Sequence, residues 1–225
     1  RCWRLLEPEE GASLVNARLK IDERVLHYLA GINRLDHRLQ ALLQPVPQDA
    51  PPLSNAQSAG VQWLLAQWPA LRQAIMLEGD DAHGQRDLAA ALAAGLGAGL
   101  YQLHGMDIPA DAAEQAAFAA LWGREAALLG AGLLLQCEGA SPEQQAASLR
   151  RARRLPGLVL LAGRDWPASD LPRHRLRIDP PEAPERRALW RAALDDLDMP
   201  IAAPALDNLA SQYRLGARRI AEIAD

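Results

Sequence analysis

The sequence predicts an α/β fold in which a parallel sheet is covered by helices. Short apolar runs alternate with longer helix-like segments through the middle of the chain. One run, "GLLLQCEG" (132–139), is continuously apolar and bounded by glycines, as in a strand buried on both faces. The first run leads into a glycine-containing loop and an alanine-rich helix, "LEGDDAHGQRDLAAALAAGLG" (77–97). A chain of 225 residues can form one such domain with a smaller appendage.

The central elements follow in a regular order. Strands are expected at five apolar segments: 74–78, 99–105, 132–139, 157–163 and 173–181. Helices are expected between them at 87–96, 111–131 and 141–155. Gly97 closes the first of these helices, and Ser141 is a suitable N-cap for the third.

One further segment lies on each side of this predicted α/β core. Residues 1–46 are expected to be an N-terminal helical segment, with Asp22 and Asp36 as N-caps of two helices. The proline-rich stretch 45–54 marks the clearest boundary in the chain. The predicted domains are therefore 1–46, an α/β core at 47–181 and a helical part at 182–225.

The last predicted helix stops while its apolar pattern is still periodic. We therefore expect a truncated helical part with apolar surface exposed near Leu215, Ile220 and Ile223. Because the chain also begins at Arg1 rather than Met, we expect it to be a piece of a longer protein.

Composition excludes several classes of function. About half the residues are apolar and the net charge is only −4, so electrostatics give no case for nucleic acid or an acidic membrane. Cys2 and Cys137 are the only cysteines, which fits a reducing cytoplasm. No apolar run reaches the length of a membrane span, and no two histidines have metal-ligand spacing on a helix.

The loop after the first strand has the glycine spacing of a phosphate-binding loop but lacks its chemistry. Gly79 and Gly84 match G-x-x-x-x-G-K-[ST], whereas Gln85 and Arg86 stand where lysine and a hydroxyl residue are needed. The one lysine of the chain, Lys20, lies far upstream in a predicted helix. Two acidic residues also lie in the loop. The candidate nucleotide-contacting residues are Gly79, Asp80, Asp81, Ala82, His83, Gly84, Gln85 and Arg86.

The order of these segments resembles an AAA+ ATPase module. The resemblance rests on the phosphate loop, "REAALLGAGLLLQCEG", "GLVLLAGRDW" and "DPPEAPERRALW", and spans nearly the whole chain. It is most similar to the degenerate first module of bacterial AAA proteins that carry two modules in tandem. The resemblance implies a three-layer P-loop NTPase-like fold with strand order 5-1-4-3-2 and a helical lid from about residue 182.

Carried onto this sequence, the family's functional positions are largely replaced. Cys137 falls where the family has the magnesium-binding aspartate, and Glu138 falls at the glutamate that activates water. A thiol is a poor ligand for magnesium. The polar sensor position falls near Ala162 and Gly163, and the segment before the fifth strand is too short for the helix that presents an arginine finger.

The resemblance implies a non-hydrolysing module that serves assembly or regulation. This fragment would bind no cofactor tightly, while a further AAA+ module in the same chain would use ATP and magnesium, and the full-length protein would form a homo-oligomeric ring. The alternative is an active ATPase or nucleotide-dependent transferase that uses Arg86 and Glu138 as its catalytic machinery. A nucleic-acid-binding module is the third interpretation, based on the arginines at 150–154, which also suit a solvated helix end.

Overall fold

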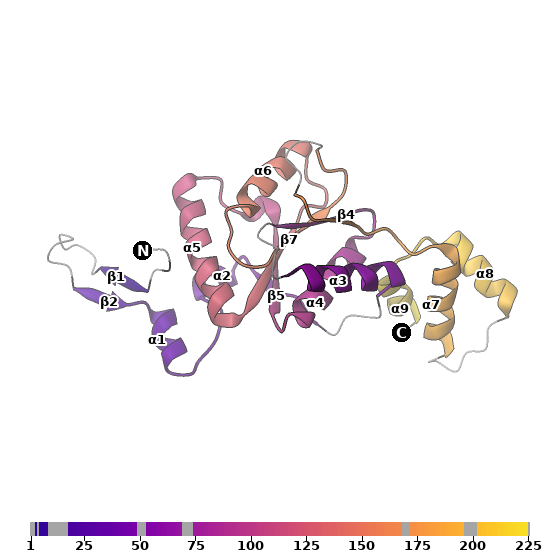
Figure 1. Cartoon of the computed structure of the whole chain (residues 1–225), viewed down its shortest axis with the longest axis horizontal. Helices are drawn as coiled ribbons and strands as arrows, with labels where there is room; N and C mark the ends of the chain where they lie inside the picture. The colour runs from indigo at the N-terminus through magenta and orange to yellow at the C-terminus, as the bar shows by residue number, and fades with distance from the viewer. Residues whose placement is uncertain are drawn as a thin grey trace.

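The computed structural model of the chain describes residues 3, 5–8, 18–48, 53–68, 74–167, 172–195 and 202–224. Parts of the predicted N-terminal segment and of the proline-rich boundary, including residues 9–17 and 49–52, lie outside this set. The described elements form a central α/β body, with a small two-stranded sheet at one end of the long axis and three helices at the other (Figure 1).

The central sheet has six strands in the order β3-β5-β6-β7-β4-β8. All neighbours are parallel except β3, which pairs antiparallel with β5 at the edge. The strands are β3 (Gln44–Pro45), β4 (Ile75–Glu78), β5 (Gly99–His104), β6 (Ala131–Gln136), β7 (Val159–Gly163) and β8 (Arg175–Arg177).

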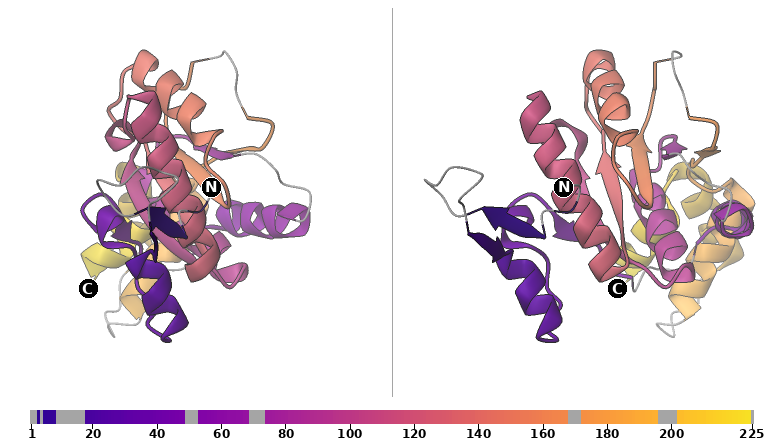
Figure 2. Two further views of the ribbon diagram at one scale, coloured as in Figure 1. Left: turned by 90° about the vertical axis from the view of Figure 1, so that its left-hand side faces the viewer. Right: turned by 60° about the vertical axis from the view of Figure 1, so that its left-hand side comes forward.

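Helices cover both faces of this sheet, as the right-hand view of Figure 2 shows. Side chains alternate between the faces: Leu133 and Leu135 of β6 join one buried cluster, and Leu134 joins the other. The first cluster includes residues of α5 and α6, and the second includes residues of α3 and α4. The helices of the body are α3 (Asn55–Gln67), α4 (Ala82–Gly95), the short 3-10 helix η2 (Gly105–Asp107), α5 (Ala112–Leu129) and α6 (Pro142–Ala152).

The prediction of a mixed α/β fold around a mainly parallel sheet is confirmed. Ser141 caps α6 as expected, with Gln144 completing a capping box. One boundary differs in a way that matters for function. The helix expected at 87–96 begins at Ala82, so only three residues separate it from β4.

The expectation of a wholly helical N-terminal segment is wrong. Residues Leu6–Pro8 form β1 and pair antiparallel with β2 (Leu19–Ile21), so Lys20 lies on a strand rather than in a helix. A proline at position 8 removes a helical hydrogen-bond donor, which disfavours the predicted helix there.

Two short helices follow, and both begin at the predicted caps. Asp22 accepts the Arg24 N–H at the start of α1 (Glu23–Leu29), and Asp36 accepts the Arg38 N–H at the start of α2 (His37–Gln40).

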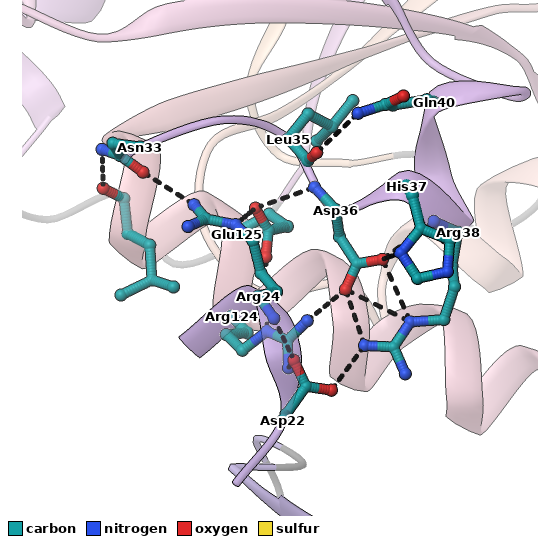
Figure 3. Close-up of polar contacts among 11 residues, drawn as sticks. Asp22, Arg24, Asn33, Leu35, Asp36, His37, Arg38, Gln40, Arg124 and Glu125 are labelled. Atoms are coloured by element: carbon teal, nitrogen blue, oxygen red, sulfur yellow. Dashed lines mark hydrogen bonds and ion pairs between the residues drawn. The ribbon is translucent and has the colours of Figure 1, made fainter. Parts of the chain in front are cut away.

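A buried ionic network attaches these N-terminal helices to α5 (Figure 3). Arg124 is fully buried on α5 and forms ion pairs with Asp22 at 3.0 Å, with Asp36 and with Glu125 at 3.2 Å. One buried guanidinium therefore neutralises carboxylates from both helix caps, which lie far from it in the sequence.

Two further arginines extend the network. Arg38 contacts Asp22 at 2.6 Å and Asp36 at 2.7 Å, and Arg24 contacts Glu125 at 2.8 Å. Burial by itself raises the pKa of the Asp22 and Asp36 carboxyls, but the hydrogen bonds and charges of the arginines outweigh it, so both pKa values are lowered. Their contribution to stability is present above the ordinary aspartate pKa and is lost as the pH falls through the lowered values.

Helices α7 (Ala183–Asp195), α8 (Ala203–Gln212) and α9 (Ala217–Ala224) form the C-terminal part. They share a small core of Trp190, Leu206 and Ile220. The expected exposure of this part is wrong for Ile220, which is buried, and for Leu215, which packs against the core. Ile223 is 58% exposed, as expected.

We predict that Arg124→Met lowers the free energy of unfolding by about 3–5 kcal/mol, because three buried carboxylates then share only the two remaining arginines, Arg24 and Arg38. Urea unfolding followed by tryptophan fluorescence measures this. Arg191→Met on the exposed surface of α7 is the matched control and should change stability by less than about 0.5 kcal/mol. Equal effects of the two substitutions would contradict a central role for the network.

Candidate functional site: the loop after strand β4

The loop Gly79–Asp81 joins the carboxyl end of β4 to the start of α4. In parallel α/β sheets this edge is where ligands bind. Here the backbone N–H groups of the loop already have partners within the protein. Gly79 donates to the Gly163 carbonyl at 3.2 Å, and Asp81 donates to the Ile178 carbonyl at 3.2 Å.

The remaining loop amide is also occupied. Asp80 donates its N–H to the Asp179 carboxylate at 3.2 Å, just beyond β8. A Cβ placed at Gly79 would lie only 2.3 Å from the Ile178 carbonyl oxygen, and Gly79 has a φ of +141°. Only glycine fits this close approach, which holds the loop against the chain that follows β8.

Asp81 is the N-cap of α4. Its side chain accepts the N–H of Gly84 at 2.9 Å, and the residue is almost fully buried. Burial raises the pKa of the Asp81 carboxyl above its ordinary value. A helix N-terminus attracts anions, and in this chain the Asp81 side chain fills the place that such an anion would take.

Gln85 stands at the position of the phosphate-loop lysine and is 1% exposed. Its side-chain amide donates to the carbonyls of Gly79 at 2.9 Å and Gly163 at 3.2 Å. The Gln85 side chain therefore joins the loop to the end of the neighbouring strand β7. A phosphate-binding lysine would instead extend outward and carry a positive charge.

The other predicted loop residues differ in exposure. Asp80 and His83 are exposed, and Ala82 is partly buried in the first turn of α4. Arg86 is also partly buried, and its Nε atom has no hydrogen-bond partner within the described part of the chain.

Cys137 and Glu138 follow β6 but do not act together. Cys137 is 2% exposed and belongs to the apolar cluster beneath α5 and α6. Burial raises the pKa of its thiol to about 11, so the thiol stays protonated at neutral pH. Glu138 is exposed in the turn that follows. The structure thus separates a buried thiol from a solvated carboxylate.

The C-terminal helices approach the same loop. A Cβ placed at Gly216, just before α9, would lie 2.4 Å from the Asp81 Oδ2 atom. Arg218 on α9 binds the Asp87 carboxylate of α4 with both ends of its fork, at 2.9 Å and 3.0 Å from Nε and 2.5 Å from Nη2. Asp87 is itself buried. We name the contacts Gly216–Asp81 and Arg218–Asp87 the α4–α9 latch.

Sequence reasoning missed most of this arrangement. It did not identify Asp87, Asp179, Gly216 or Arg218, because their roles depend on contacts between distant segments. The only local signal was the pair Asp80–Asp81 next to a helix start, which is typical of an N-cap.

Comparison with known proteins relates the C-terminal part to an ATPase family. Residues 182–225 match the family model described as the contractile injection system ATPase helical domain. This span holds α7, α8 and α9, and therefore the α9 side of the latch. No curated protein shows significant similarity to the chain.

No group of three or more His, Cys, Asp or Glu side chains within the described residues is placed to hold a metal ion. None of the helices that these residues form is long and apolar enough to cross a bilayer.

We predict that at about pH 4 Asp81→Asn is as stable as the wild type, whereas Asp81→Ala costs about 1 kcal/mol, because asparagine still caps α4 and alanine cannot. The raised pKa of Asp81 means that its stabilising contribution is present below the ordinary aspartate pKa and is lost as the pH rises through the raised value. As the pH rises from about 4 to about 7, the free energy of unfolding of Asp81→Asn should therefore increase relative to that of the wild type. Urea unfolding at both pH values measures this, and equal destabilisation by Asn and Ala would exclude the capping role.

We further predict that Arg218→Met loosens α9 from the body, because the substitution removes the bidentate contact to Asp87. Hydrogen exchange should become faster across α9 and remain unchanged across α5. Arg219→Met is the matched control, since Arg219 pairs with Glu222 within α9 and does not reach α4. Unchanged exchange in the Arg218 variant would contradict the latch.

Proposed function

We propose that this chain is a non-hydrolysing AAA+ module of an ATPase associated with a contractile injection system. The main support for the proposal is that the protein's own side chains occupy the phosphate-binding positions in the loop after β4. Asp81 occupies the anion position at the start of α4, and Gln85 is turned inward where a phosphate-binding lysine would extend.

The order of the parallel strands supports the AAA+ interpretation. Numbered along the chain, the strands β4, β5, β6, β7 and β8 lie in the order 5-1-4-3-2 across the sheet. This is the order that the family resemblance implies. The match of residues 182–225 to the contractile injection system ATPase helical domain supports the link to that class of ATPase.

The residues around the loop do not fit a magnesium–nucleoside triphosphate. A triphosphate needs free backbone N–H groups and a cation, but the amides of Gly79, Asp80, Asp81 and Gly84 are already bonded within the protein. The carboxylates of Asp80 and Asp81 would also repel phosphate oxygens. Magnesium would also lack its usual ligands. Arg86 stands where a hydroxyl residue is needed, and the buried Cys137 stands where a carboxylate is needed.

The latch supports a role for such a module in assembly. A ligand shifts the orientation of a lid only when it binds one orientation better than another. Here the contact between α4 and α9 is made by the protein's own Asp87 and Arg218. The module would then hold one lid orientation while a further AAA+ module of a longer chain binds ATP and magnesium and completes a homo-oligomeric ring.

We predict that the purified chain neither binds nor hydrolyses ATP. Isothermal titration with ATP and magnesium should show a dissociation constant of millimolar order or weaker, which corresponds to at most about 4 kcal/mol of binding free energy. Phosphate release should equal that of buffer.

The alternative is an ATPase or nucleotide-dependent transferase that uses Arg86 and Glu138. Phosphate release that is abolished by Glu138→Gln but not by Glu143→Gln, an exposed carboxylate at the start of α6, would establish that alternative and overturn the proposal.

A further inference from the structure

A groove lies between α5 and α6, on the sheet face opposite to α4. It has a volume of about 250 Å³ and continues into a second hollow of about 240 Å³. The two hollows share Gln115, Arg151 and Arg154 in their walls. We name this joint cavity the arginine groove.

The floor of the groove is apolar and shaped for close approach. Ala112, Ala116 and Ala119 recur on one face of α5 at the spacing of helical neighbours. Ile108, Phe118 and Leu155 complete this floor. Small side chains along a helix allow another backbone to lie close to it, and each methyl group that becomes buried contributes to binding.

The rim of the groove carries positive charge without acidic partners. Arg150 and Arg151 form no side-chain hydrogen bond or ion pair within the described ranges, and Arg154 donates only to the neutral Gln115 amide at 3.4 Å. By contrast, the arginines of the network in Figure 3 bind carboxylates. The charge of the rim is thus unneutralised in a chain whose net charge is −4.

We propose that the arginine groove binds an acidic amphipathic helix of a partner protein. Apolar side chains along one edge of that helix would lie on the alanine floor, and its carboxylates would pair with the arginine rim. Charge complementarity selects the acidic partner, and an alanine face on α5 beside α6 allows another helix to lie close to it. This site is separate from the loop after β4, so the proposal does not depend on whether the chain binds or hydrolyses nucleotides.

Nucleic acid fits the groove less well. Binding of single strands uses exposed aromatic side chains on which bases stack. The described lining contains one aromatic side chain, Phe118, and it is 4% exposed. An apolar floor also leaves the polar edges of bases without partners.

The test uses a labelled synthetic helix of about 14 residues, with leucine at helical spacing and glutamate on both flanks. A second peptide replaces every glutamate with lysine, and a labelled oligothymidylate of similar length is the third probe. Fluorescence anisotropy with the full chain should show saturable binding of the glutamate peptide only, weakening as salt is raised.

Two variants localise the binding. Ala116→Arg fills the floor, and Arg151→Glu reverses the rim; each should weaken binding of the glutamate peptide by about ten-fold or more, equivalent to about 1.4 kcal/mol. Ala127→Arg on exposed α5 surface outside the groove and Arg191→Glu on α7 are the matched controls and should bind as the wild type does.

Circular dichroism of each variant confirms folding before the comparison. The proposal is overturned if the lysine peptide binds as well as the glutamate peptide, or if the groove variants bind like their controls. Binding of the oligonucleotide that is lost in the same variants would instead identify a nucleic-acid surface and equally overturn it.

Discussion

The hydrogen bond from the Gly84 amide to the Asp81 side chain determines the structure of the loop at the carboxyl end of β4. It makes α4 begin within three residues of β4, which leaves no open loop between the strand and the helix. The same carboxylate lies against Gly216, so any side chain there would collide with it. One buried aspartate thus shapes both the loop and the approach of the C-terminal helices.

Two sets of buried charges hold the ends of the molecule to the central body. At one end, Arg124 joins the caps of α1 and α2 to α5. At the other, Arg218 joins α9 to α4 through Asp87. In both cases an arginine binds a buried carboxylate from a distant segment, and removing the arginine would deprive that buried carboxylate of a counter-charge. Such pairs favour one arrangement of the parts over others, as the proposed role in assembly requires.

The sequence was sufficient for the central strands and for most helix starts, because their signals are local. Continuous apolar runs marked β6 and β7, and Ser141, Asp22 and Asp36 act as the predicted caps. It failed where long-range contacts decide the structure. The strand pair β1–β2 and the early start of α4 depend on partners that periodicity does not reveal. The inward turn of Gln85 likewise depends on the Gly163 carbonyl at the end of another strand.

We expect the loop after β4 and the α4–α9 latch not to respond to nucleotide. Hydrogen exchange across residues 79–95 and 202–224, measured with and without ATP and magnesium on the longest chain that can be purified, tests it most directly. Exchange should be identical in both segments under the two conditions, because the amides of Gly79, Asp80, Asp81 and Gly84 and the Asp87–Arg218 pair are already bonded within the protein. Nucleotide-dependent protection at the start of α4, or a change in α9, would contradict it.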